Sequence, residues 1–175
     1  MYRPQPSEYA QSPFVSRYID QVGEGNVLDV LTAQLAEAQQ LFSRFSEVQG
    51  AYAYGEGKWS LKELFGHMID TERIQAYRAL CIARGEKQPL PGFDENTYAQ
   101  SAQFSRQSFR DLLQPHRLVR ESNLALFRTF TAEMLVRKGN ANGKDITVRA
   151  LLYVITGHER HHLTIFRERY LPGLK

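Results

Sequence analysis

Cysteine is nearly absent from this sequence, since Cys81 is the only one among 175 residues. A single thiol excludes an internal disulfide, and the N-terminus lacks the charged and then apolar layout of a secretory signal, so a reducing cytoplasm is the expected compartment. Long hydrophobic runs are also absent, because no stretch approaches the roughly 18 consecutive apolar residues that span a bilayer. We therefore expect no membrane partner.

The charge pattern lacks any run of five or six residues of one sign. The net charge of +3 comes from 22 basic and 19 acidic residues that are interspersed along the chain. Without a basic face and interleaved aromatic residues, a nucleic-acid partner is not expected. The 12 glycines and 7 prolines are scattered rather than clustered, and the length suits one domain, residues 1–175, with a core of about 26–171.

Four segments carry apolar residues at helical spacing, with turn-forming residues between them. The predicted helices cover roughly residues 26–45, 60–83, 108–136 and 147–170, and a short helix is considered within residues 12–18. The firmest boundary is at Ser60, where the hydroxyl and the carboxylate of Glu63 can form a capping box. Pro115 should kink the third helix or delay its start.

Strand-like alternation is absent, so the predicted fold is all-α. Each amphipathic helix can bury its apolar stripe against the others in a four-helix bundle. About two dozen residues separate the second helix from the third, which exceeds the 2 to 8 residues usual between antiparallel neighbours. We therefore predict a long crossover between these helices, which could cover a pocket.

The chain contains five histidines, and two of them point to a metal site. His158 and His162 are four residues apart on the apolar stripe of the last helix, so both side chains face inward. His67, on the apolar stripe of the second helix, is the natural third ligand. Three histidines leave a coordination position open for water or substrate, as in catalytic sites. Against this, lone histidines are commonly core residues and histidine pairs also occur on solvated faces.

The other candidate residues have simpler interpretations. His116 could be a fourth ligand, a proton shuttle or a hydrogen-bonded core residue, and the last is favoured. His161 is placed at the helix edge, and Glu159 at the surface or edge because it lies about 100° from His158 on the helical wheel. Cys81 is interpreted as a small core residue, too far along its helix to join His67. The remaining polar candidates could orient ligands, or form a solvated or paired helix face: Asp70, Glu72 and Arg73.

Several motifs resemble those of the DinB/YfiT-like superfamily. They span nearly the whole domain and include the following runs: Gly57 to Glu63, Gly66-His67, Asp70 to Arg73, Tyr77 to Leu80, Pro89 to Asp94 and Gly157 to Tyr170. The resemblance implies a four-helix bundle of unusual topology with three histidines that bind a divalent metal, commonly zinc or nickel. By motif position these are His67, His158 and His162. Pro115 departs from the pattern and leaves one pocket wall undefined.

The resemblance leaves the activity open, because the superfamily includes thiol-dependent transferases and isomerases, hydrolases and members without an assigned activity. The first hypothesis is a metal-dependent enzyme that transfers a low-molecular-weight thiol onto an electrophilic small molecule. A hydrolase that activates water with the same three histidines is its closest variant. The alternative class is a metal-binding, dimerising helical module without catalysis, with a closed site for which His116 could be the fourth ligand and with no adjoining cavity. A homodimer is implied by analogy only.

Overall fold

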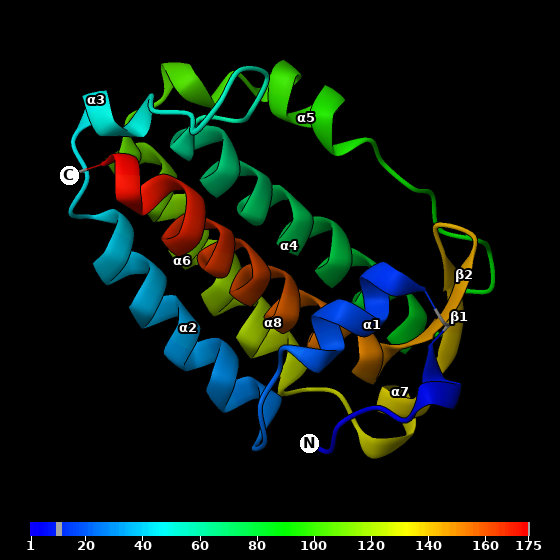
Figure 1. Ribbon diagram of the computed structural model, residues 1–175. Helices are drawn as coiled ribbons and strands as arrows, with labels where there is room; N and C mark the ends of the chain where they lie inside the picture. Colours follow the sequence, from blue (N-terminus) through cyan, green and yellow to red (C-terminus); the bar gives the residue numbers. More distant parts are fainter. Residues whose placement is uncertain (10–11, 175) are drawn as a thin grey trace.

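Four long helices form the body of the protein (Figure 1). The computed structural model describes residues 1–9 and 12–174, and the long helices are α2 (Val27–Phe42), α4 (Leu61–Ala83), α6 (Phe109–Phe127) and α8 (Val148–Ile165). In Figure 1, α2 and α8 run in one direction along the bundle and α4 and α6 in the other. α4 packs against α6 and α8, and α2 packs against the same two helices. The predicted all-α bundle is confirmed.

Each long helix begins at a polar residue whose side chain accepts a hydrogen bond from the first turn. These N-caps are Asn26, Ser60, Ser108 and Thr147. Capping satisfies amide groups that have no partner within the helix. The capping box predicted between Ser60 and Glu63 is present in both directions. The sequence signals for helix starts were therefore reliable.

The third predicted helix, residues 108–136, is wrong in its extent. α6 ends at Phe127, and a separate short helix, α7 (Ala132–Val136), follows with Thr131 as its own N-cap. Pro115 lies inside α6 and does not delay its start. The helix tolerates the missing proline amide because α2 and α4 pack against it.

A β-hairpin lies where no strand was predicted. Strands β1 (Lys138–Ala141) and β2 (Lys144–Thr147) pair antiparallel across Asn142 and Gly143, both of which have positive φ angles. An Asn-Gly pair is the strongest short-range signal for such a two-residue turn. The strands are only four residues long, so their alternation is too brief to be recognised by period.

The link between α4 and α6 crosses over the bundle as predicted. Because α4 and α6 run in the same direction, the chain must return along the bundle between them (Figure 1). On the way, the amide of Leu90 donates to the Asn140 carbonyl and its own carbonyl accepts from Asn142, at 2.9 Å each. The link then forms α5 (Glu95–Ala102), which packs on α4. The crossover thus joins the hairpin at one end of the bundle.

Two further α-helices pack on the bundle, and short 3₁₀ helices cover Pro6–Glu8 and Phe104–Arg106. The short helix α1 (Pro13–Asp20) packs on α8, as Figure 1 shows, and α3 (Glu47–Gly50) packs on α4. After α8, the chain forms a π-helical segment, Phe166–Tyr170, and a short 3₁₀ turn, Leu171–Gly173. Among the helices of residues 1–9 and 12–174, none combines the length and apolar character needed to cross a membrane.

The core has two apolar clusters, one toward each end of the bundle, separated by a buried polar layer. Along α4, the first cluster ends at Ile69 and the second begins at Ala76. Along α8, which runs the other way, the second cluster ends at Ile155 and the first begins at Leu163. His67 lies two residues before Ile69 and adjoins this layer. Nine further buried polar residues form it: Gln34, Thr71, Glu72, His116, Arg120, Thr156, His158, Glu159 and His162. Buried polar groups are costly unless they are satisfied. This layer is therefore the place to look for function.

Candidate metal centre

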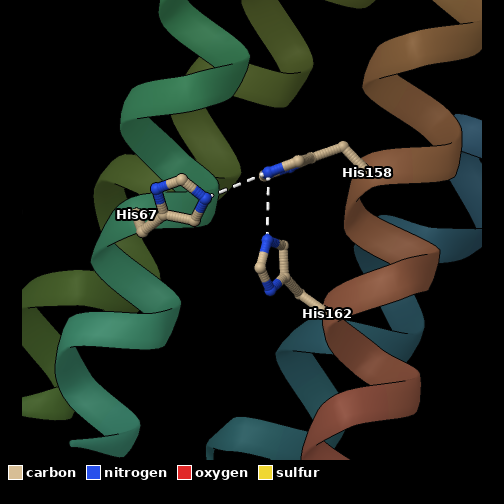
Figure 2. A group of neighbouring side chains, drawn as sticks. All are labelled: His67, His158 and His162. Carbon is tan, nitrogen blue, oxygen red and sulfur yellow. Dashed lines mark hydrogen bonds between the residues drawn. The ribbon is translucent and has the colours of Figure 1, made fainter. Parts of the chain in front are cut away.

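Three histidine rings converge in the polar layer. The Nε2 atom of His158 lies 3.0 Å from Nε2 of His67 and 3.0 Å from Nε2 of His162. Figure 2 shows the rings from α4 and α8 pointing toward one another in the space between these helices. All three side chains are buried, with 6 to 8% of each residue exposed. The structure therefore brings together the three residues that the spacing and the resemblance singled out.

Burial keeps these rings neutral. It lowers the pKa of His67 to about 4. Burial, reinforced by the neighbouring histidines, also lowers the pKa values of His158 and His162 well below the ordinary 6.5. A metal ion requires deprotonated imidazole nitrogens. At neutral pH the three rings are thus in the form that binds a cation.

The arrangement fits a divalent ion. Bonds of 2.0 to 2.1 Å in a tetrahedral zinc site place neighbouring ligand nitrogens about 3.3 Å apart, close to the 3.0 Å observed here. The single lone pair on His158 Nε2 cannot accept good hydrogen bonds from both neighbouring imidazoles, whereas one cation can bind a lone pair from each of the three rings. The Nδ1 atom of His162 is buried without a hydrogen-bond partner among the described residues. Imidazole ligands suit zinc, copper, iron and nickel.

Neighbouring aromatic rings hold the histidines in place. The ring of Trp59 packs on His67 at 4.7 Å between centroids, and Tyr18 of α1 meets His158 edge-on at 5.3 Å. α1 approaches this closely because position 157 is glycine: a Cβ atom there would lie 1.8 Å from the Tyr18 carbonyl oxygen. Gly157 therefore has a packing role next to the first histidine of the pair.

A pocket of about 420 Å³ opens onto the histidines. His67, His158 and His162 line it together with Thr71, whose hydroxyl lies 3.5 Å from Nδ1 of His67. Most of the other lining residues come from α1, the crossover and the hairpin, and more than half of them are apolar or aromatic. Sites for small molecules are typically concave, largely apolar and of this size. The crossover does line a pocket, as its length suggested.

A second polar cluster lies behind the histidines and is organised by Arg120. Its guanidinium donates to both carboxylate oxygens of Glu72 at 2.8 Å, to Glu159 at 2.6 Å and to the Leu31 carbonyl at 2.8 Å. Burial alone would raise the pKa of Glu159, but the charge of Arg120 and hydrogen bonds from His116 and Arg120 lower it to about 2. One cation thus ties together α2, α4, α6 and α8.

His116 belongs to this second cluster. Its Nδ1 atom lies 3.0 Å from the side-chain nitrogen of Gln39, and its Nε2 atom lies 3.3 Å from a carboxylate oxygen of Glu159. Its partners make it a hydrogen-bonded core residue, the interpretation that the sequence favoured. Glu72, His116 and Glu159 lie close enough to hold a cation, but the guanidinium of Arg120 already supplies the positive charge there.

The placement of Glu159 at the surface or edge was wrong, because only 3% of the residue is exposed. The helical-wheel argument assumed that only one face of the last helix is buried, whereas α1, α2 and α4 all pack against α8. Glu72 is buried as well and is paired with Arg120 rather than solvated. The sequence reasoning missed Arg120 itself. A charged residue at an inward position of the third helix was the available signal.

The remaining candidates lie outside both clusters. His161 is half-buried and packs against Tyr18 at 5.6 Å between ring centroids. Asp70 and Arg73 pair with each other on the surface of α4 at 3.2 Å. Cys81 is half-buried and packs against the apolar cluster near the hairpin. The ring of His161 also contacts that of His162 at 5.2 Å between centroids, but none of these four residues is among those whose ligand atoms converge in the histidine group.

Comparison with known proteins gives the family. The model of the DinB superfamily matches residues 31–166, so this chain belongs to the DinB superfamily. Among solved structures, it is similar to YfiT from Bacillus subtilis, described as a probable metal-dependent hydrolase with an unusual four-helix bundle topology. The TM-score is 0.78 at 18% identity, and the match covers 98% of this chain and 93% of YfiT. No curated protein matches the sequence.

Proposed function

We propose that this protein is a metal-dependent enzyme that acts on a small molecule. His67, His158 and His162 would hold one divalent ion, zinc or nickel, in the wall of the pocket. The observation that carries the proposal is the convergence of three neutral Nε2 atoms at the surface of a 420 Å³ pocket, with that of His158 3.0 Å from each of the other two. A structural site would be closed, whereas an enzyme needs this opening.

The chain's own residues would prepare the site for chemistry. When bound, a divalent ion with three neutral ligands supplies Lewis acidity and lowers the pKa of a water or thiol that joins it. Trp59 and Tyr18 fix the orientation of the rings and reduce the access of water around them. The apolar walls would hold the body of the substrate next to the open side of the histidines.

We favour transfer of a low-molecular-weight thiol onto an electrophile as the reaction. A thiol is more acidic than water, so an ion with uncompensated charge ionises it readily near neutral pH. Hydrolysis is the second candidate, and the specific observation in its favour is the fold shared with YfiT, which is described as a probable hydrolase. Both reactions would use the same three histidines.

A non-catalytic metal-binding module is less well supported. That alternative predicted a saturated site, for which His116 was the candidate fourth ligand, but His116 faces Gln39 and Glu159 instead. It also required the absence of an adjoining cavity, and a pocket adjoins the histidines. Pairing of two chains into a homodimer stays a prediction.

Turnover with added thiols tests the proposed reaction. Protein loaded with zinc or nickel is mixed with bacillithiol, mycothiol or glutathione and a chromogenic electrophile, and conjugation is followed by absorbance. We expect a rate that depends on both the thiol and the metal. Chelated protein is the first control.

Matched histidine variants distinguish the site from a general effect. His162→Ala should abolish the rate, whereas His161→Ala, which alters the adjacent residue outside the group, should leave it within about twofold. Absence of conjugation with every thiol, together with metal-dependent cleavage of ester or amide substrates, would replace transfer by hydrolysis. Absence of both activities would refute the proposed function.

A further inference from the structure

Arg78 lines the same pocket as the three histidines. It lies on α4 with His67, Thr71 and Gln75, and the spacings of four, four and three residues place all of them on one face of the helix. The helix rises about 16 Å from His67 to Arg78. The pocket therefore extends along α4, with the histidines toward one end and a guanidinium toward the other.

The guanidinium of Arg78 is buried without a counter-charge. Only 5% of the residue is exposed. It donates hydrogen bonds to two neutral acceptors, the side-chain oxygen of Gln75 at 3.2 Å and the Pro91 carbonyl at 2.6 Å, and it lies over the ring of Phe93 at 5.9 Å. Among the ion pairs of residues 1–9 and 12–174, none within 4.0 Å includes Arg78. Burial accordingly lowers its pKa with no opposing charge.

Arg120 is a buried arginine whose charge is fully paired, in contrast to Arg78. It is completely buried and meets two carboxylates, Glu72 and Glu159. A buried charge without such partners is strongly destabilising. Arg78 remains protonated under all ordinary conditions and uses only part of its five N–H donors. An anion from solution would pair with its charge and accept hydrogen bonds from its unused N–H donors.

The other charges of the pocket are nearer to solvent. Glu95 and Asp145 are exposed, and Asp145 also accepts a hydrogen bond from Asn140 at 3.1 Å. Lys144 is half-buried and donates to the hydroxyl of Ser12 at 3.2 Å. Solvent screens such exposed charges, whereas it screens a buried one much less. The inner part of the pocket is therefore positive at Arg78.

We propose that Arg78 binds the carboxylate of an elongated, otherwise largely apolar ligand whose other end reaches the three histidines. The proposal deepens the proposed function and rests on it for the role of the histidine end. A carboxylate fits because it accepts two parallel N–H bonds from one guanidinium and carries a single negative charge. A phosphate with two charges would need more than this one buried cation.

The carboxylate site is tested first in metal-free protein, where the histidine end plays no part. Octanoate and octanol have the same chain and differ in charge, and their binding is compared by calorimetry. We expect octanoate to bind at least about tenfold more tightly, the amount expected for a charge-assisted hydrogen-bonded pair. Equal binding of the two compounds, or no binding of octanoate, would overturn the proposal whatever the metal does.

Variants assign the preference to Arg78. In Arg78→Gln the preference for octanoate should fall to about twofold or less, while octanol binding stays unchanged. Arg73→Gln removes the same charge from the exposed side of α4 and should keep the full preference. Arg78→Lys keeps the charge without the planar fork and should retain an intermediate preference. A full preference in Arg78→Gln would refute the assignment, and the comparison in wild-type protein stands even where a variant fails to fold.

A second arm connects the carboxylate to the histidine end. Zinc-loaded protein is titrated with ω-mercaptoalkanoates of increasing chain length and with the matching ω-mercaptoalcohols. We expect one chain length to bind best, and only the acids to lose affinity in Arg78→Gln. Octanoate could bind preferentially while the thiol group adds no affinity for zinc-loaded protein. That result would support the carboxylate site at Arg78 and count against the proposed function alone.

Discussion

Arg120 is the residue whose replacement should disturb the bundle most. Its guanidinium is fully buried and donates to Glu72 and Glu159 at 2.6 to 2.8 Å and to the carbonyl of Leu31 at 2.8 Å. Arg120→Met has a similar size and removes the charge. The variant leaves two buried carboxylates without their cation and one carbonyl without its donor.

The expected cost follows from these contacts. Breaking a buried ion pair costs about 3–5 kcal/mol, and leaving a backbone carbonyl without its donor adds about 1 kcal/mol. The free energy of unfolding at neutral pH should thus fall by about 5 kcal/mol. For a chain of this length that corresponds to a lower melting temperature by about 10–20 °C. Urea titration and thermal melts followed by circular dichroism measure both quantities.

The pH dependence separates this mechanism from simple loss of packing. Glu159 has a lowered pKa of about 2 in the wild-type protein because Arg120 outweighs the effect of burial. Without Arg120, burial would instead raise the pKa above its unfolded value of 4.5, so the folded variant takes up protons. The difference in free energy of unfolding between wild-type protein and Arg120→Met should therefore be largest above about pH 7 and shrink toward pH 5.

Two further variants test the reasoning. Arg117→Met changes an exposed arginine on the same helix, which pairs with Glu121, and should alter stability by less than about 0.5 kcal/mol. Combining Arg120→Met with Glu72→Gln and Glu159→Gln removes the orphaned charges and should restore part of the loss. A deficit for Arg120→Met equal to that of Arg117→Met, or one independent of pH, would refute this explanation.

Two further predictions concern the histidines and the helix packed against them. In metal-free protein, burial lowers the pKa of His67 to about 4, so protons bind the unfolded chain first as the pH falls below 6.5. Between pH 6.5 and 4, His67 alone should lower the free energy of unfolding by about 3 kcal/mol in urea titrations, and His158 and His162, whose pKa values are also lowered, add to the decline. A flat profile would contradict neutral buried rings. Gly157→Ala places a Cβ 1.8 Å from the Tyr18 carbonyl, and overpacking should cost about 1–3 kcal/mol and expose α1 to limited proteolysis, unlike Gly23→Ala, which meets nothing within 4 Å.

The sequence was sufficient for the bundle and for the histidine group because both depend on short-range periodicity. Residues four apart on a helix share a face whatever surrounds it, which is why His158 and His162 could be paired without coordinates. The capping residues at Ser60 and Asn26 are equally local signals and were placed correctly. His67 required only the further assumption that apolar stripes face a common core.

The features that escaped prediction depend on contacts between distant segments. Glu159 looked exposed because a helical wheel considers one helix, and only the covering of α8 from several sides buries it. Arg120 acquires its role from residues on three other helices, which no spacing reveals. The hairpin was overlooked although Asn142 and Gly143 marked its turn, because its strands are too short for a visible period.

Metal content per chain tests the central claim most directly. The protein is purified without chelators, equilibrated with zinc, freed of unbound ion and measured by elemental analysis beside His158→Ala and His161→Ala. With three histidines from two helices as the ligands, wild-type protein and His161→Ala should each retain about one ion per chain, and His158→Ala should retain less than about a tenth of that. A full equivalent in His158→Ala, or none in the wild-type protein, would contradict the assignment of His67, His158 and His162 to a metal.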